Sequence, residues 1–194
     1  PETRPLLTDT TATEGEEDAK LSQVLDLSKE MKNGVLNWNA PEGNWTIIRF
    51  GYSATGRDVS TSSGKWQGLV IDYNSEKHFN RYWDTNVEPL LKMIGNKAGR
   101  TLKYLQTDSF EAGGMNWSDK FEDEFKKRRG YDPLLYLPIL TGKIIENRES
   151  SNRFLTDLRK TLSDCISDNH YRVFAKRARE YGMGIQPESA GPHA

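Results

Sequence analysis

The chain has a single cysteine, Cys165, among its 194 residues. No disulfide can form within it, so its stability must come from packing. It also lacks any apolar run near the roughly 20 residues that a membrane-spanning helix needs. Basic and acidic residues nearly balance, 27 against 28, for a formal net charge of −1. Without a basic excess, attraction to nucleic acid or anionic lipid is not expected, and we predict neither a membrane span nor a nucleic-acid partner.

Several signatures of cofactor and nucleophile chemistry are missing as well. The sequence contains neither a G-x-G-x-x-G loop, nor a Walker-type phosphate loop, nor a G-x-S-x-G nucleophile elbow. One cysteine and three scattered histidines give little support to a zinc site. These absences predict a protein that needs no organic cofactor.

The two ends suggest a piece of a longer polypeptide. The chain opens on Pro1 instead of Met and stops soon after a predicted strand. We divide it into an N-terminal arm with a short helix, residues 1–40, and a main unit, residues 41–194. Within the arm, residues 1–20 are polar and predict a linker or mobile segment, and residues 21–33 predict a short amphipathic helix.

The main unit alternates between strand and helix patterns. Strands are predicted at 45–50, 68–73, 102–107 and 184–187, and helices at 75–97, 118–129 and 151–181, with a loop and short helix at 134–145. Such alternation is typical of an α/β fold, with parallel strands and outer helices. Acids at several strand ends favour a partial (β/α)8 TIM-type barrel with about three to four βα units. The open edges should pair with the remainder of the barrel or with another copy.

Acidic residues follow the strand predicted at 102–107. Asp108 and Glu111 come next, then two glycines and Trp117. A carboxyl here could act as a general acid if partial burial and a neighbouring acid raise its pKa. Asp108 could coordinate Ca²⁺ or hold a sugar hydroxyl, and Trp117 could stack on a sugar face. The alternative for Glu111 is a loop carboxylate that caps backbone N–H groups. For Asp72, after the strand at 68–73, capping of the next helix is the better interpretation.

A second glutamate, Glu188, follows the last predicted strand. It could be a partner carboxylate, a substrate ligand or a metal ligand, and its alternative is an ordinary turn residue. His193 is close behind it and is a further candidate for substrate binding. Two glutamates at strand ends favour acid–base chemistry, for which sugar hydrolysis is the commonest use. The basic run at 126–129 suits the C-terminus of a helix, with nucleic-acid binding as the less favoured alternative.

An ordered set of motifs resembles glycoside hydrolase family 106, the α-L-rhamnosidases. The motifs run from residue 44 to 191 and are NWTIIRFGYSATG at 44–56, TDSFEAGGMNW at 107–117, FKKRRGYDP at 125–133 with YLP at 136–138, RFLTD at 153–157 and PESAG at 187–191. Each motif is modest alone, whereas the ordered set is fairly specific.

The resemblance implies part of a large enzyme whose (β/α)8 domain hydrolyses α-L-rhamnosides in complex glycans, with inversion and a bound calcium ion. It implies Glu111 as general acid, and Glu188 as a calcium or substrate ligand or as the base. It also suggests a periplasmic or secreted location. The alternatives are a retaining glycosidase that uses both glutamates and a carbohydrate-binding fragment without turnover. Inverting carboxyl pairs stand about 6.5–9.5 Å apart, against about 5–5.5 Å for retaining pairs. The chain alone is expected to be inactive.

Overall fold

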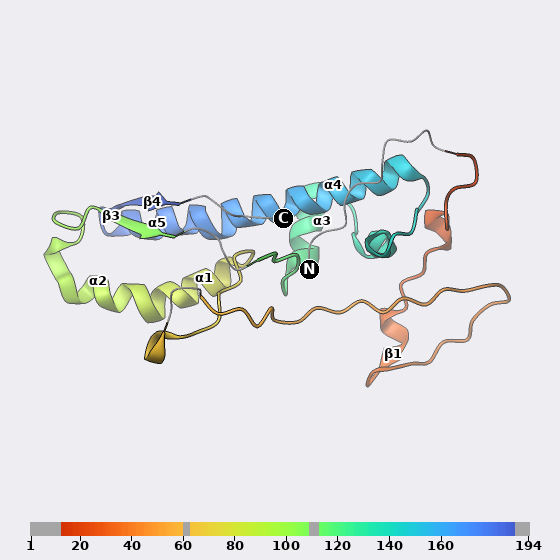
Figure 1. The fold of residues 1–194 in the computed structure, drawn as a ribbon, viewed down its shortest axis with the longest axis horizontal. Coiled ribbons are helices and arrows are strands. Elements are labelled where there is room, and N and C mark those ends of the chain that lie inside the picture. The colour runs from red at the N-terminus through yellow and green to blue at the C-terminus, as the bar shows by residue number, and fades with distance from the viewer. Residues whose placement is uncertain (1–12, 60–62, 109–112, 189–194) are drawn as a thin grey trace.

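A computed structural model describes residues 13–59, 63–108 and 113–188 of the chain. The molecule is elongated, and one long helix runs along most of its length (Figure 1). This helix consists of α4 (Arg148–Cys165), a π-helical stretch η7 (Ile166–Tyr171) and α5 (Arg172–Glu180). The other elements pack beside it, and none of the described helices is both long and apolar enough to cross a membrane.

The long helix follows from its sequence. The side chain of Asn147 caps it by accepting a hydrogen bond from the Ser150 backbone N–H at 2.8 Å. Apolar residues at helical spacing are buried along it, and Gly182, with φ of +68°, follows its end. The helix predicted at 151–181 is therefore confirmed, with a start three residues earlier.

Two hydrophobic clusters line this helix. The first lies around α3 (Phe121–Arg129) and α4, and its buried members are Phe121, Phe125, Leu137, Ile139, Ile145, Phe154, Leu155, Leu158 and Leu162. The second lies around α1 (Glu76–Tyr82), α2 (Glu88–Ile94) and α5, and its buried members are Phe79, Trp83, Leu91, Val173, Phe174, Ala178 and Met183. The molecule therefore has two packed centres joined by one helix.

Strands β3 (Tyr104–Thr107) and β4 (Gly184–Pro187) form a parallel pair, as predicted for 102–107 and 184–187. Tyr104 is opposite Gly184, and Thr107 is opposite Pro187. Helices α3 and α4–α5 come between the two strands in the chain, which makes one strand–helix–strand crossover. The described residues thus form an α/β arrangement with several helices and few strands.

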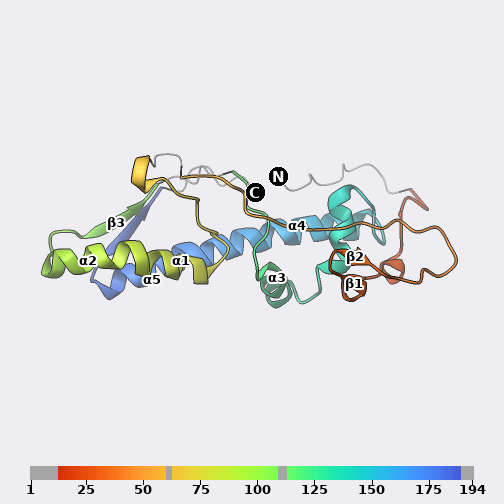
Figure 2. The ribbon, with the colours of Figure 1, turned by 90° about the horizontal axis from the view of Figure 1, so that it is seen from below.

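The remaining elements are short. Between α1 and α2 the π-helical stretch η4 (Trp83–Val87) continues the helix, and the 3-10 turn η5 (Gly95–Lys97) ends it, as predicted for 75–97. A small antiparallel hairpin forms in the N-terminal part of the chain (Figure 2). The hairpin strands are β1 (Met31–Lys32) and β2 (Val35–Leu36), and the other 3-10 turns are η1 (Leu21–Gln23), η2 (Ser28–Glu30), η3 (Gly64–Trp66) and η6 (Leu134–Thr141).

Three predicted elements are wrong. Residues 45–50 form no strand, and 68–73 contribute only an isolated bridge between Leu69 and Asp58. A β-prone segment becomes a strand only where a partner takes up its backbone hydrogen bonds, and within the described residues β3 and β4 pair only with each other. Residues 21–33 form η1, η2 and β1 in place of a helix, because the turn at Asn33–Gly34, with φ of +50° and +80°, folds the segment back into the hairpin.

The arm predicted to be mobile is held in place from residue 13 onward. Glu16 forms an ion pair with Arg148 at 2.7 Å, and Asp18 forms one with Lys143 at 2.7 Å. Ala19 also bridges to Ile145 next to the first hydrophobic cluster. The described part of the arm is therefore attached to the start of α4, while the boundary predicted at residue 40 stays a prediction.

Candidate active-site edge

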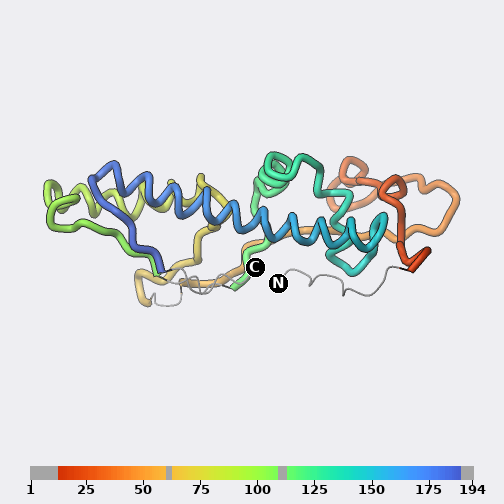
Figure 3. The backbone as a smooth tube through the Cα atoms, turned by 90° about the horizontal axis from the view of Figure 1, so that it is seen from above, coloured from red at the N-terminus to blue at the C-terminus, as the bar shows by residue number. Residues whose placement is uncertain are grey.

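Two acidic residues follow the ends of the parallel strands. Asp108 comes directly after β3, and Glu188 comes directly after β4. The backbone N–H of Glu188 donates to the Thr107 carbonyl at 3.0 Å, which continues the ladder past the strand ends. The ends of β3 and β4 converge at one place (Figure 3), and both acidic residues are exposed there. We call Asp108 and Glu188, with the strand ends that carry them, the carboxylate edge.

Glycines allow the backbones that support this edge to approach closely. At Gly184, a Cβ atom would lie 2.9 Å from the Tyr104 ring, so a larger residue would push against β3. At Gly99, whose φ is +73°, a Cβ atom would lie 2.5 Å from the Tyr181 carbonyl oxygen. On the buried side, Leu105 and Ile185 pack against the second cluster. The pair of strands is therefore packed against the second cluster, and its ends carry the two acidic residues.

The structure brings some of the predicted site residues together and leaves others untested. Asp108 and Glu188 come together at the edge, as parallel strands require. Glu111 and His193 lie outside the described residues, so their roles stay predictions. Trp117 is half-buried and packs against Phe121, with ring centroids 4.8 Å apart. That contact makes it a neighbour of the first cluster, and its predicted stacking on a sugar is left untested.

Arg57 is a residue that the sequence reasoning did not single out. Its guanidinium lies 3.9 Å from where a Cβ of Gly113 would be, beside the segment that leads from β3 to α3. Its backbone is held by a hydrogen bond from the Val70 N–H at 2.9 Å, and the side chain is exposed. An exposed guanidinium beside Gly113 can bind hydroxyl or carboxylate groups. The only signal in the sequence was an arginine between glycine and aspartate in a polar loop.

Asp72 does not cap α1, which the sequence favoured, because Ser75 is the N-cap and Asp72 closes the turn just before it. Its Oδ1 accepts from the Asn74 N–H at 2.9 Å, just before Ser75 caps α1 by accepting from the His78 N–H. Burial raises the pKa of the Asp72 carboxyl, and nearby Asp119 adds to the effect. The His78 Nδ1 lies 3.7 Å from its Oδ2 and opposes that shift. The result is a structured turn at the start of α1.

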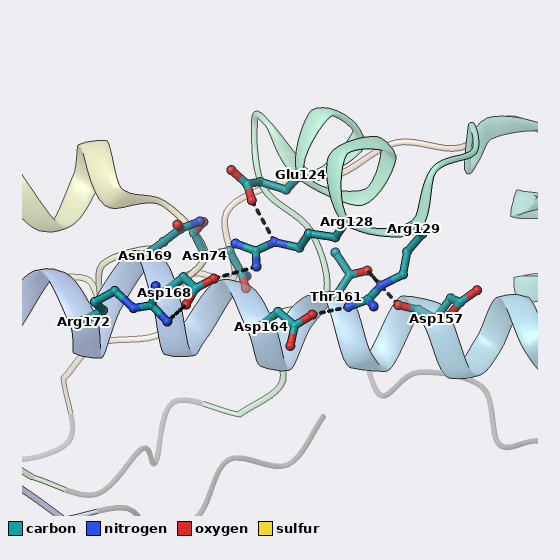
Figure 4. Close-up of polar contacts among 10 residues, drawn as sticks. All are labelled: Asn74, Glu124, Arg128, Arg129, Asp157, Thr161, Asp164, Asp168, Asn169 and Arg172. Atoms are coloured by element: carbon teal, nitrogen blue, oxygen red, sulfur yellow. Dashed lines mark hydrogen bonds and ion pairs between the residues drawn. The ribbon is translucent and has the colours of Figure 1, made fainter.

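The basic run joins α3 to the long helix (Figure 4). Arg128 donates to Glu124 at 2.9 Å and to Asp168 at 2.6 Å. Arg129 donates to the Thr161 hydroxyl at 2.9 Å and pairs with Asp164. These two guanidinium groups already have acidic partners within the fold, which favours the structural interpretation of the run over nucleic-acid binding.

Metal ligation finds limited support in the side chains. Within 13–59, 63–108 and 113–188, no three or more His, Cys, Asp or Glu residues gather closely enough to hold a metal ion. The carboxylate edge supplies two acidic residues, whereas calcium usually takes six to eight oxygen ligands. The described side chains therefore do not make a calcium site by themselves.

Comparison with known proteins gives consistent results. The family model of glycoside hydrolase family 106, described as alpha-L-rhamnosidase, matches residues 4–194. A Formosa agariphila protein named "Putative beta-glucuronidase" is 33% identical over 184 residues, which is 94% of this chain and 16% of that protein. The solved structure of a rhamnosidase from Novosphingobium sp. PP1Y matches with a TM-score of 0.76 and 30% identity, over 88% of this chain and 17% of that one.

The chain thus spans about one sixth of the length of these relatives. The match covers nearly all of the sequence and includes every motif that suggested the resemblance. We conclude that the chain belongs to glycoside hydrolase family 106, the α-L-rhamnosidase family.

Proposed function

We propose that this chain is part of a (β/α)8 glycosidase domain and that the carboxylate edge lies in its sugar-binding site. The observation that carries the proposal is the position of Asp108 and Glu188, side by side after two parallel strands. In (β/α)8 enzymes, catalytic residues occupy this end of the strands. The preferred substrate is an α-L-rhamnoside within a complex glycan, and the rest of the barrel is supplied by sequence beyond this chain.

The proposed reaction is hydrolysis with inversion at the anomeric carbon. Glu111, three residues beyond Asp108, protonates the leaving-group oxygen as general acid. A carboxylate on the opposite side of the ring takes a proton from the attacking water. Glu188 either fills that role or binds the sugar hydroxyls, and Asp108 orients the sugar through its hydroxyls. The alternatives are a retaining reaction with Glu188 as nucleophile and sugar binding without turnover.

A β-glucuronide is a second candidate substrate. The name of the Formosa agariphila relative raises it, and the exposed guanidinium of Arg57 beside Gly113 favours a substrate with a carboxylate. Arg57→Gln should then lower kcat/KM for an aryl β-glucuronide at least tenfold and leave an aryl α-L-rhamnoside nearly unaffected. Equal effects on both substrates would remove the basis for this second candidate.

Calcium remains a separate proposal, with Glu188 as one ligand and other ligands outside the described residues. We derive no catalytic step through it. Calorimetric titration with Ca²⁺ should show binding that Glu188→Gln weakens. Unchanged binding in the variant would remove Glu188 from the ligand set.

Site-directed variants test the proposed reaction in a protein that extends this chain to the length of its relatives. We expect Glu111→Gln and Glu188→Gln each to lower kcat/KM on an aryl α-L-rhamnoside by at least about 100-fold. Glu42→Gln, at an exposed position outside the helices and strands, is the matched control and should keep full activity. Full activity in both Glu111→Gln and Glu188→Gln would refute the assignment.

The configuration of the product separates the remaining alternatives. NMR recorded during hydrolysis should show the inverted anomer first. The retained anomer would establish the retaining reaction, and sugar binding that survives Glu111→Gln with no hydrolysis by the parent protein would establish the non-catalytic one.

A further inference from the structure

A buried histidine holds a turn against the middle of the long helix. His170 in η7 is 4% exposed, and its ring stacks on Tyr73 with centroids 3.9 Å apart. Phe79 of α1 meets the same ring edge-on at 4.9 Å. The neighbouring Asn169 side chain donates to the Asn74 carbonyl at 2.8 Å. The turn at 72–74 is therefore attached to η7 by one ring stack and one hydrogen bond.

The His170 ring lies in a setting suited only to its neutral form. Its Nδ1 is buried and has no hydrogen-bond partner within the described parts of the chain. The side-chain amide of Asn74, a residue that is 2% exposed, also has no hydrogen-bond partner there. A protonated imidazole carries an N–H on both ring nitrogens, and each needs an acceptor. In His170 the N–H at Nδ1 would be buried without an acceptor.

The charged groups on the surrounding elements either have other partners or face solvent. The paired groups are Asp168 with Arg128 and Arg172, His78 with Asp72, and Arg177 with Asp84 and Glu88. The exposed ones are Glu76, Lys77, Arg81, Lys176, Arg179 and Glu180. The groups that contact the ring itself are Tyr73, Phe79 and Tyr171, and none of these carries a negative charge that would stabilise an imidazolium at neutral pH.

We propose that His170 makes the attachment of the 72–74 turn sensitive to acid: protonation releases the turn, and with it the start of α1, from the long helix. The turn leads from the 63–71 segment into α1, so its release would free that segment as well. This inference does not depend on the proposed glycosidase reaction.

The direction of the effect follows from linkage. Burial lowers the pKa of His170 to about 4, against an ordinary value of 6.5 that applies once the turn opens. Because the open state binds the proton more readily, the attachment is strongest above pH 6.5 and weakens as the pH falls toward about 4. Between pH 7.5 and 5, the equilibrium constant for opening should rise about 30-fold.

Hydrogen exchange measures this opening. Peptides that cover residues 72–82, corrected for the intrinsic pH dependence of exchange, should show the rise in the unmodified chain. His170→Phe keeps an aromatic ring on Tyr73 and removes the titrating group, so it should show no such rise. His78→Gln, which changes the neighbouring histidine, is the matched control and should retain it. The same rise in His170→Phe, or none in the unmodified chain, would overturn the proposal.

NMR titration of the unmodified chain tests the proposal even if His170→Phe does not fold. The His170 Cε1–H signal should titrate with a midpoint near 4. A midpoint near the ordinary value of about 6.5 would overturn the proposal, because closed and open states would then bind the proton equally.

Discussion

Single side chains decide how closely the segments of this molecule approach. Gly99 permits contact between the turn before β3 and the end of α5, and Arg128 joins α3 to η7. Gly99 allows the close contact because it has no Cβ atom. Arg128 makes its contact because its guanidinium carries several N–H donors. Both effects can be measured by substitution.

Gly99→Ala should destabilise the chain more than Gly130→Ala does. Both glycines have positive φ, near +73° and +83°, so alanine is strained at either position at about 1 kcal/mol. Only at Gly99 would the new Cβ meet a backbone oxygen, at 2.5 Å. Urea unfolding should therefore give the larger loss for Gly99→Ala, by at least about 1 kcal/mol. Equal losses would contradict the close approach.

Arg128→Met should cost about 1–3 kcal/mol of unfolding free energy at pH 7, because it removes charged hydrogen bonds from Glu124 and Asp168. The Arg128 guanidinium lowers the pKa of Asp168. The stability that this ion pair contributes is fully present above the ordinary Asp pKa of 3.8. It is lost as the pH falls through the lowered pKa of Asp168. Denaturation at both pH values should show a smaller difference in unfolding free energy between Arg128→Met and the unmodified chain at pH 3 than at pH 7. The exposed neighbour Lys127→Met should have little effect at either pH.

At the scale of elements, the sequence pattern predicted the helices and strands whose formation depends on neighbouring residues. The helix from Arg148 to Glu180, the helical run from Glu76 to Lys97 and strand β4 were all predicted, because caps, glycines and apolar spacing mark them in the sequence. Residues 45–50 and 68–73 have strand composition, yet within the described residues 45–50 form no strand and 68–73 make only the isolated bridge between Leu69 and Asp58. A strand depends on distant backbone, which a local pattern does not contain.

The N-cap of α4 gives a prediction at the same scale. Asn147→Ala should cost about 1 kcal/mol in thermal or urea unfolding, because the Ser150 N–H loses its acceptor. Asn147→Asp retains an acceptor oxygen and should stay within about 0.5 kcal/mol of the unmodified chain. A loss of the same size in both variants would show that Asn147 stabilises the helix by some means other than capping.

At the scale of the whole molecule, the sequence predicted the class and the family, and it indicated part of the candidate site. Parallel pairing brought Asp108 and Glu188 to one edge, as strand-end acids in an α/β pattern suggested. The place of Arg57 depends on a long loop crossing to Gly113, and nothing in the sequence pattern indicated that contact. The sequence pattern likewise did not predict the packing of residues 13–20 against the start of α4. That packing depends on ion pairs with Arg148 and Lys143, which lie far away in the chain.

The exposed apolar side chains predict how the chain behaves alone. Large apolar residues exposed around α2, β3 and the preceding loops include Leu69, Leu90, Met93 and Tyr104. Such surface is commonly covered by other protein. We expect the isolated chain to self-associate in sedimentation velocity and to show no rhamnoside hydrolysis, whereas the extended protein should be active. Turnover by the isolated chain would contradict the need for the remaining barrel.

The most direct test of the account is a crystal structure of the extended protein with L-rhamnose bound. The account predicts the sugar at the carboxyl ends of β3 and β4, with Asp108 or Glu188 within hydrogen-bonding reach of its hydroxyls, about 2.6–3.2 Å. A sugar bound elsewhere, with both carboxylates turned away from it, would contradict the carboxylate edge as the sugar-binding site.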